Sequence, residues 1–234
     1  MTLHIHTEVV SEFQQNARVL IDDSTQKVMI IDPGAEVEKL LEIANTSINQ
    51  IESIFFTHCH IDHCGGASEL LNLIANQNLP KPTLYYHSKD YPIAENIENQ
   101  AMMFGVFGSK YKNPPKPDIL LDDCKSVKCG KVELSCLYTP GHAPGHVALY
   151  SSSEDIQLHG SFSEEVNKRP LLLAGDALFY NGIGRTDLPL ANYAELIDSI
   201  KEKLFTLPDE TVVLPGHGPN TTIEREKKYN PFIL

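Results

Sequence analysis

The feature that most constrains this chain is a run of ligand-type side chains directly after an apolar segment. Residues 51–56 predict a strand, and three histidines and an aspartate follow it closely, as His58, His60, Asp62 and His63. In an extended or tightly turning segment His58 and His60 project to the same side, so both imidazoles can reach one divalent ion. Asp62 and His63 can then turn toward a second ion. The stretch predicts a metal site, and the alternative is a polar surface turn.

Composition limits the class of protein and of partner. The chain has 234 residues, 41% of them hydrophobic, which is enough for one large domain over residues 1–234. Its formal net charge of -12 at pH 7 argues against nucleic acid or an anionic membrane surface as a partner, because both would repel an acidic protein. We therefore expect a small-molecule substrate, while composition leaves the oligomeric state open.

The cysteines and the first residues of the chain indicate a compartment. There are 5 cysteines and no Cys-x-x-Cys pair, and a domain of this size needs no disulfides to be stable. The first residues lack a basic segment followed by an apolar one, and no apolar run is long enough to span a membrane. The expectation is a cytoplasmic protein with free thiols.

Strand and helix patterns alternate along the first half of the chain, which favours an α/β architecture. Alternating and apolar runs predict strands, and apolar residues at helical spacing predict helices. The predicted strands cover residues 5–9, 17–21, 27–31, 51–57, 84–87, 131–138, 147–150, 171–176 and 211–214, and the predicted helices cover residues 36–45, 67–75 and 193–205.

Two stretches are less regular. Residues 91–117 predict a short helix followed by a loop stiffened by Pro114, Pro115 and Pro117. The apolar residues of this stretch either close the edge of the core or line the mouth of a substrate site. Residues 151–169 are polar and rich in Ser and Glu, and they predict an exposed hairpin or loop.

Three further ligand-type residues stand at the ends of predicted strands. His142 lies in the turn between two strands, Asp176 ends an apolar strand, and His217 follows the last one. One such residue alone is more often a hydrogen-bonded surface or core group, or a helix cap. Their recurrence at one kind of position favours a common site, because a rigid scaffold presents ligands on the loops at a sheet edge.

Together these residues resemble the motifs of the metallo-β-lactamase superfamily. The matching pieces extend over most of the chain and are His58-x-His60-x-Asp62-His63, Thr139-Pro140-Gly141-His142, Gly175-Asp176 and Pro215-Gly216-His217-Gly218. The resemblance implies an αββα sandwich as a single domain, with a binuclear metal centre at one edge of its two sheets.

The resemblance also implies a role for each of these residues. It places three ligands on each of two divalent metals and joins the metals through one bridging residue: His58, His60 and His142 for the first metal, Asp62, His63 and His217 for the second, and Asp176 between them. A bridging water or hydroxide would be the nucleophile, since two divalent ions lower the pKa of a shared water. Nitrogen and carboxylate ligands suit zinc, which we expect, and also iron or manganese. Asp62 and Asp176 are the expected catalytic carboxylates.

Within the superfamily, the chain is similar to the short glyoxalase II-like hydrolases. The resemblance rests on residues 175–179, 182–189 and 215–226. It implies hydrolysis of a thioester, typically S-D-lactoylglutathione to D-lactate and glutathione. Arg185 would bind the anionic end of glutathione, because a guanidinium holds a carboxylate through two hydrogen bonds. Its alternative role is an ion pair with Asp187.

The tail departs from the glyoxalase II pattern. In this chain 17 residues follow His217, where the full-length enzymes carry a helical region with basic residues for glutathione. The segment 223–229 can supply one cation, through Arg225, Lys227 or Lys228.

Two other functions are compatible with the motifs. Persulfide dioxygenases share the histidine-rich motif, Asp176 and the run 184–187, but they hold a single iron through two histidines and one carboxylate. A binding module without turnover is expected to have lost ligands, and all seven are present.

Cys59 and His146 lie close in sequence to the predicted ligands. Strand alternation points Cys59 away from His58 and His60, which predicts packing in the core. His146 either orients a ligand through a hydrogen bond or is an ordinary residue of a turn.

Overall fold

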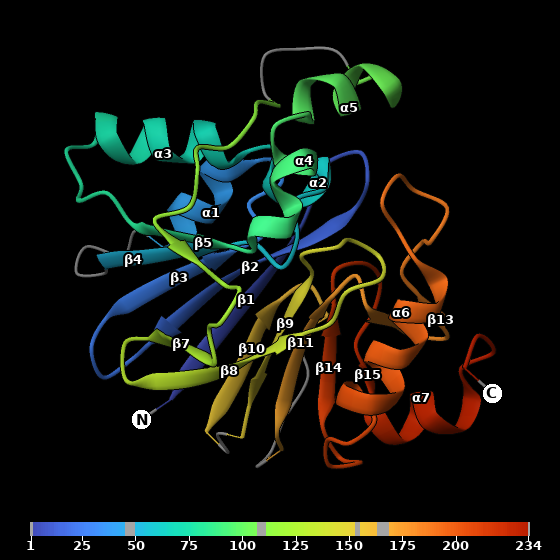
Figure 1. Ribbon diagram of the computed structural model, residues 1–234. Helices are drawn as coiled ribbons and strands as arrows, with labels where there is room; N and C mark the ends of the chain where they lie inside the picture. The colour runs from blue at the N-terminus through green and yellow to red at the C-terminus, as the bar shows by residue number, and fades with distance from the viewer. Residues whose placement is uncertain (1, 45–49, 107–110, 153–154, 163–168, 234) are drawn as a thin grey trace.

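Two β-sheets lie face to face, and helices cover the outer side of each (Figure 1). The computed structural model describes residues 2–44, 50–106, 111–152, 155–162 and 169–233. This arrangement confirms the αββα sandwich that the motifs imply. Side chains from the inner faces of both sheets form a shared core, in which Leu20, Phe55, Leu149 and Leu173 are buried.

The first sheet contains the N-terminal strands. Its order is β10 (Ile156–Gly160), β1 (Leu3–Val10), β2 (Gln15–Asp22), β3 (Lys27–Ile31), β4 (Gln50–Phe55), β5 (Thr83–Tyr86) and β6 (Ile119–Leu120). The strands β1 to β3 pair antiparallel, and β4, β5 and β6 continue the sheet in parallel. Helices supply the crossovers between the parallel strands, as such connections require.

The second sheet contains the strands that precede the later ligands. Its order is β15 (Thr221–Thr222), β14 (Val212–Pro215), β11 (Leu171–Gly175), β9 (Val147–Ser151), β8 (Val132–Tyr138) and β7 (Ser126–Cys129). The strand β11 is buried along its whole length, which explains its continuous apolar sequence. A separate hairpin consists of β12 (Leu178–Phe179) and β13 (Gly182–Ile183).

The helices pack through apolar stripes. The first sheet is covered by α1 (Val37–Ala44), α3 (Ala67–Asn76), α4 (Tyr91–Ala94) and α5 (Ile97–Met103), and the second by α6 (Tyr193–Ser199) and α7 (Ile223–Tyr229) (Figure 1). A 3-10 turn, Ser88–Asp90, precedes α4. The predicted helix 193–205 is present, but its last turn, Ile200–Leu204, is π-helical. Asn45, predicted to end the helix 36–45, lies outside the described residues.

The prediction for residues 151–169 is wrong for its central part. Instead of an exposed hairpin or loop, Ile156–Gly160 forms strand β10, which pairs in parallel with β1 at the edge of the first sheet. The chain therefore crosses from the second sheet to the first and back. An edge strand has few buried side chains, so its sequence is polar and lacks the apolar signal of a strand. Residues 153–154 and 163–168 lie outside the described residues.

The irregular stretch 91–117 contains two short helices, α4 and α5, and then an extended segment. Ile93 and Ile97 are buried and close the core, whereas Met103 is 74% exposed. The buried residues confirm the interpretation that this stretch closes the core, while the interpretation that it lines the mouth of a substrate site stays a prediction. Residues 107–110 are not among those described.

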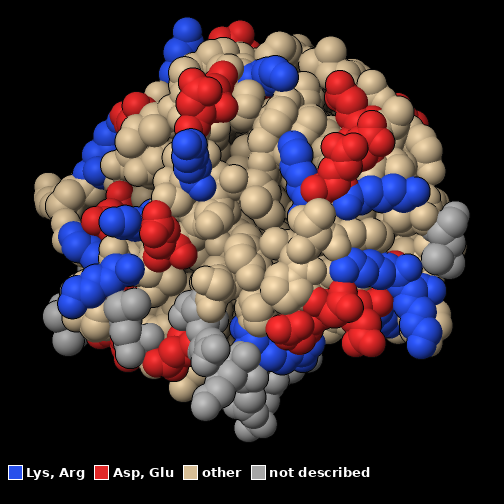
Figure 2. Space-filling view, turned by 60° about the horizontal axis from the view of Figure 1, so that its bottom comes forward, with Lys and Arg blue, Asp and Glu red and all other residues tan. Residues whose placement is uncertain are grey.

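The surface of the molecule is mixed in charge. On the face drawn in Figure 2, Lys and Arg side chains alternate with Asp and Glu side chains around a central area of other residues. Within the described ranges, none of the helices combines the length and the apolar character needed to span a bilayer.

Candidate metal centre

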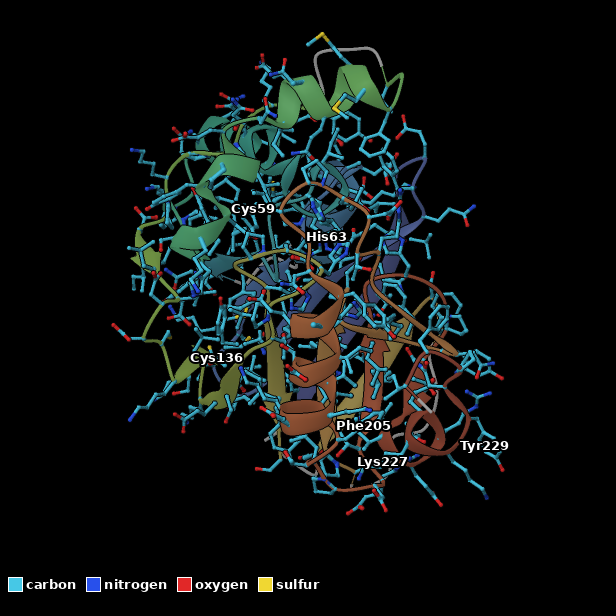
Figure 3. All side chains as sticks on the ribbon, turned by 45° about the vertical axis from the view of Figure 1, so that its right-hand side comes forward. Cys59, His63, Cys136, Phe205, Lys227 and Tyr229 are labelled. Atoms are coloured by element: carbon cyan, nitrogen blue, oxygen red, sulfur yellow. The ribbon has the colours of Figure 1, made fainter. Side chains whose placement is uncertain are left out.

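The seven predicted ligands lie together at one edge of the sandwich. They follow strands of both sheets or stand on the short helix α2 (Ile61–Cys64), and they are His58, His60, Asp62, His63, His142, Asp176 and His217. Figure 3 shows His63 near the middle of the molecule. Because strands of both sheets end at this edge, residues that are far apart in the sequence meet there.

Three histidines form the first group of donor atoms. One ring nitrogen from each of His58, His60 and His142 lies within 4.8 Å of the other two. His60 Nδ1 is 2.9 Å from His142 Nε2. Three imidazoles around one point form a common ligand set for zinc, and they leave a position open for a further ligand.

Asp62, His63 and His217 form the second group, within the same 4.8 Å limit. Asp62 Oδ2 is 3.0 Å from His217 Nε2 and 3.7 Å from His63 Nε2. One carboxylate and two imidazoles are likewise a ligand set for divalent zinc, iron or manganese. The structure therefore brings together both ligand sets that the superfamily pattern implies.

Asp176 lies between the two groups. Its Oδ1 is 3.3 Å from His63 Nε2, and its Oδ2 is 3.5 Å from His142 Nε2 and 3.6 Å from His217 Nε2. A carboxylate that lies near nitrogens of both groups is placed to bridge two cations.

Several buried atoms of the cluster make no hydrogen bond. Among the described residues these include His58 Nε2, His63 Nε2 and Asp176 Oδ1. A buried polar atom without a partner costs about 1–3 kcal/mol, so native proteins rarely keep several together. Divalent ions would satisfy all three atoms at once. The residues present thus fit a metal centre.

Asp32 supports the cluster from outside, and the sequence motifs do not reveal its role. Its Oδ2 accepts hydrogen bonds from His63 Nδ1, at 2.9 Å, and from the Thr57 hydroxyl, at 2.7 Å. Its Oδ1 accepts one from the Thr57 backbone N–H, at 2.7 Å. These bonds fix the His63 ring with Nε2 toward the cluster, as carboxylates commonly do for metal-binding histidines.

His146 orients Asp176. Its Nε2 accepts a hydrogen bond from the Asp176 backbone N–H, at 3.0 Å, and its Nδ1 lies 2.8 Å from the Thr139 hydroxyl. Of the two roles considered for this residue, the structure supports the orienting one, through the backbone of the ligand.

Asp90 joins two of the loops that carry ligands. Its carboxylate accepts hydrogen bonds from Cys59 N, at 2.9 Å, and from Gly145 N, at 2.5 Å. Burial raises the pKa of Asp90 to about 7, in spite of these two donors. Nothing in the motifs identifies this residue, because its partners are backbone groups of other segments.

Two glycines allow the backbone to pass close to Asp176. Gly175 has a φ of +49°, and a Cβ there would lie 2.6 Å from His146 Nε2. A Cβ on Gly216 would lie 2.0 Å from Asp176 Oδ1. Gly175 in the Gly-Asp motif and Gly216 in the Pro-Gly-His-Gly motif are therefore required because a larger residue would clash with its neighbours.

The ionisation of the cluster matches a site for cations. Burial lowers the pKa of His60 to about 3 and that of His58 well below its usual value, which keeps both rings neutral and able to bind a metal. Burial also opposes a charge on His63, but the carboxylates of Asp176 and Asp62 outweigh it and raise the pKa of His63. The field between these carboxylates thus favours a positive charge at the second group.

Arg18 is a further buried charge beneath the cluster that the motifs do not reveal. It is 3% exposed, and it donates hydrogen bonds to the carbonyls of Asn16, at 3.0 Å, and Pro215, at 2.7 Å. Burial lowers the pKa of Arg18 to about 10, although Asp32 raises it. The contact with Pro215 fixes the segment that carries His217.

A pocket of about 390 Å³ opens directly onto the cluster. Its lining includes five of the predicted ligands: His60, Asp62, His142, Asp176 and His217. The other walls come from the β1–β2 turn, from α4 and α5, and from the loop before α6. A concave site beside convergent polar groups is a typical place for a small-molecule substrate.

Arg185 lines this pocket and pairs with Asp187. Its Nε and Nη2 donate to the two oxygens of Asp187, at 2.9 and 2.8 Å. Both side chains are largely exposed, so the pair contributes little to stability. The structure shows the alternative role considered for Arg185, while substrate binding stays a prediction.

The cations of the tail have other partners. Arg225 lies 3.7 Å over the ring of Tyr180 and donates to Glu226, and Lys227 pairs with Asp209 at 2.6 Å. Figure 3 shows Lys227 near the lower end of the molecule, away from His63. The prediction that the tail supplies a cation to the site is therefore not supported by these contacts.

The remaining histidines and Cys59 lie outside the cluster. Cys59 is fully buried in the core under the first sheet's helices, as strand alternation predicts. His6 stacks on His159, with ring centroids 4.5 Å apart, at the edge between β1 and β10. His87 stacks on Tyr138, at 4.8 Å.

Comparison with known proteins agrees with the fold. A family model described as the metallo-beta-lactamase superfamily matches residues 11–163 and 157–217. The hydroxyacylglutathione hydrolase GloC of Haemophilus influenzae is 32% identical over 237 residues, covering 99% of this chain and 98% of that protein.

Two solved structures are similar over nearly their whole length. The crystal structure of BLEG-1 B3 metallo-beta-lactamase has a TM-score of 0.80 and 30% identity, covering 98% of this chain and 99% of that one. The structure of TTHA1623 in a di-iron-bound form has a TM-score of 0.76 and 33% identity, covering 97% and 98%. One relative with a similar fold thus holds two iron ions.

Proposed function

This chain belongs to the metallo-β-lactamase superfamily, a superfamily of metallo-hydrolases, and from that premise we propose that it is a binuclear-metal hydrolase that cleaves thioesters. The proposed substrate is S-D-lactoylglutathione, and the products are D-lactate and glutathione. The observation that carries the proposal is the pair of three-residue donor groups joined by Asp176 at the end of an open pocket. Similarity to a hydroxyacylglutathione hydrolase supports the choice of substrate.

The ligands divide as the motifs imply. His58, His60 and His142 would hold one ion, and Asp62, His63 and His217 the other, with Asp176 shared. When bound, two divalent ions polarise a carbonyl group and lower the pKa of water at the site. Zinc is the proposed metal, with iron and manganese compatible with the same ligands.

Asp62 and Asp176 would balance part of the positive charge of the two metal ions. Burial would raise the pKa of Asp62 and Asp176, but the neighbouring histidines outweigh it and lower both. Both carboxylates are therefore ionised at neutral pH and balance part of the charge of two divalent cations. The remaining positive charge would stabilise the oxyanion that forms when the thioester carbonyl is attacked.

The substrate enters through the pocket, and Arg185 stands at its wall. We propose that Arg185 binds a carboxylate of the thiol carrier through its guanidinium. To do so, it would give up its exposed hydrogen bonds to Asp187. A small thioester is the proposed partner, rather than nucleic acid or a membrane. All five cysteines are free, which supports a reducing cytoplasmic location.

The test is a metal count beside two assays. Purified protein is analysed for bound metals, then mixed with S-D-lactoylglutathione while thiol release is followed, and with glutathione persulfide while oxygen uptake is followed. We expect two metals per chain, thiol release and no oxygen uptake. A single iron with oxygen uptake would instead identify a persulfide dioxygenase.

A matched pair of variants checks the centre. Asp176→Asn removes the bridging charge and is expected to lose at least one metal and about a hundredfold or more in kcat. Asp198→Asn makes the same change at an exposed position of α6 and is expected to behave like the wild type. Full activity and two metals in Asp176→Asn would contradict the bridging role.

A further inference from the structure

We infer that the pocket also takes thioesters whose acyl group is apolar and larger than lactoyl, and that it binds them more tightly. This inference rests on the proposed function and adds a substrate class to it. Six apolar residues line the same pocket as the donor cluster, and we call them the apolar wall: Phe13, Ile93, Met103, Phe104, Leu188 and Leu190. These residues come from three separate segments, so the fold assembles the wall next to the metal centre.

The apolar wall exposes side chains that usually avoid water. Met103 is 74% exposed, Leu190 is 58% exposed and Phe104 is 45% exposed. The rings of Phe13 and Phe104 meet edge to face at 5.4 Å, which ties the β1–β2 turn to the end of α5. Exposed apolar side chains that line a pocket form a binding surface, because a ligand that covers them removes them from water and thereby binds more tightly.

The backbone holds Leu190 in an unfavourable conformation. Its φ is +68°, in the left-handed region that residues with a Cβ rarely adopt. Backbone strain of this kind is uncommon and occurs most often at binding and catalytic sites. Here it places an apolar side chain at the pocket wall, with more than half of its surface exposed.

The polar residues of the lining outside the cluster are already engaged. Gln100 accepts from Ile61 N, at 3.2 Å, and donates to the Ile93 carbonyl, at 3.1 Å. Asn96 accepts from Asn99. Arg185, the cation among the described lining residues, is paired with Asp187. The wall therefore offers contact area rather than hydrogen bonds or charge.

The apolar character of the wall determines whether the acyl group or the thiol carrier of a thioester contacts it. Thiol carriers such as glutathione carry ionised carboxylate and ammonium groups, which would lose hydration against apolar side chains. The acyl group carries no such charge and is joined directly to the carbonyl that the metal centre must reach. The acyl group therefore lies on the apolar wall, and the carrier extends past Arg185 toward solvent.

The size of the effect follows from the area buried. Each methylene moved from water to an apolar surface improves binding by about fourfold at most. A six-carbon acyl chain is thus expected to gain roughly tenfold to a hundredfold over acetyl, whereas lactoyl gains little because its hydroxyl stays polar.

The experiment compares one carrier with a series of acyl groups. The metal-loaded protein is assayed with the S-acetyl, S-D-lactoyl, S-butanoyl and S-hexanoyl thioesters of glutathione, and kcat/KM should rise from acetyl to hexanoyl. In parallel, calorimetry measures Kd for S-methylglutathione and S-hexylglutathione, which cannot be hydrolysed. We expect S-hexylglutathione to bind at least tenfold more tightly.

Two neighbouring methionines provide a matched control. Met103→Ala removes part of the apolar wall and is expected to reduce the preference for the hexyl group severalfold. Met102→Ala removes a side chain that is 61% exposed on the same helix but does not line the pocket, and it should keep the preference. Both sites are exposed, so neither change threatens the fold.

The outcomes separate this inference from the proposed function. Thioester hydrolysis with kcat/KM that is flat or falls with chain length would overturn the inference and leave the proposed function intact. Equal Kd values for the methyl and hexyl compounds would overturn it as well. Tight binding of S-hexylglutathione without hydrolysis of any thioester would uphold the apolar wall and overturn the proposed function.

Discussion

At the scale of single residues, the second nitrogen of each ring decides what a histidine can do. His63 Nδ1 donates to Asp32, and His142 Nδ1 donates to the Arg185 carbonyl, at 2.9 and 2.8 Å. The Thr57 hydroxyl donates to Asp32, so its oxygen can accept from His58 Nδ1, at 3.1 Å. In the neutral rings of His58 and His142, Nε2 is therefore the unprotonated nitrogen that faces the centre. The carboxylates beside His63 favour a positive charge there, which a bound cation would supply in place of the proton.

Asp22 illustrates how a buried carboxylate can link stability to pH. It ends β2 and accepts hydrogen bonds from the Lys131 N–H, at 2.8 Å, the Thr25 hydroxyl, at 2.7 Å, and Ser24 N, at 2.9 Å. Burial by itself would raise the pKa of Asp22, but these donors outweigh it and lower the pKa to about 2. Through Lys131 the carboxylate also joins the first sheet to the β7–β8 turn.

We predict that Asp22→Asn is less stable than the wild type at pH 7, by about 2 kcal/mol. A lowered pKa means that the ionised form stabilises the fold above pH 4. This contribution is lost as the pH falls from about 4 to 2. Urea unfolding at several pH values should show the difference between wild type and variant shrinking over that range.

The neighbouring Asp23 is the control for this prediction. Its side chain is exposed and accepts one hydrogen bond, from Thr2 N at 2.9 Å. Asp23→Asn should have little effect on stability and no comparable pH dependence. A stability difference for Asp22→Asn that stays constant from pH 7 to 2 would refute the role of the charge.

At the scale of elements, α7 is held by one buried carboxylate. Glu226 Oε1 accepts from the Thr221 hydroxyl, at 2.6 Å, and from Arg225 Nη1, at 2.7 Å. Its Oε2 accepts from Asn230 Nδ2, at 2.9 Å, and from Asn181 N, at 3.0 Å. The helix is thereby attached to β15, to the β12–β13 turn and to the residues that follow it.

We predict that Glu226→Gln destabilises the protein by about 3 kcal/mol. An amide nitrogen cannot accept hydrogen bonds, so two of the four donors lose their partner in a buried site. Glu224→Gln makes the same change at an exposed position of α7 and is expected to stay within about 0.5 kcal/mol of the wild type. Chemical unfolding measures both, and equal effects would contradict the prediction.

The helices and strands differ in how well their own sequences predict them. The hairpin β2–β3 and the strand β11 carry clear alternating or apolar patterns, and they form where predicted. The strand β10 carries no such pattern. It is held in place by its hydrogen bonds to β1, and few of its side chains are buried. The π-helical end of α6 also leaves no sequence signal, since the predicted spacing of apolar residues continues through it.

At the scale of the whole molecule, the cluster joins the two sheets. The ligands from His58 to His63 follow β4 in the first sheet, whereas Asp176 and His217 follow β11 and β14 in the second. Metal ions bound by both sets would therefore cross-link the sandwich at this edge. Unfolding would separate the ligands, so metal binding must favour the folded state.

We predict that removing the metals lowers the melting temperature without unfolding the protein at room temperature. A metal present at about a thousand times its Kd adds roughly 4 kcal/mol per site to the folded state. Calorimetry with and without a chelator measures the shift, and circular dichroism checks that the secondary structure remains. An unchanged melting temperature, in protein shown to have lost its metals, would contradict this.

The sequence by itself determined the class of fold, and it predicted the donor residues that the structure brings together at one edge. Ligand-type residues directly after predicted strands follow from local chemistry that neighbouring residues reveal. Only the tertiary structure decided what surrounds them. Asp32, Asp90 and Arg18 act through partners distant in the chain. The apolar wall likewise exists because three separate segments meet at one edge, and such contacts leave no local pattern.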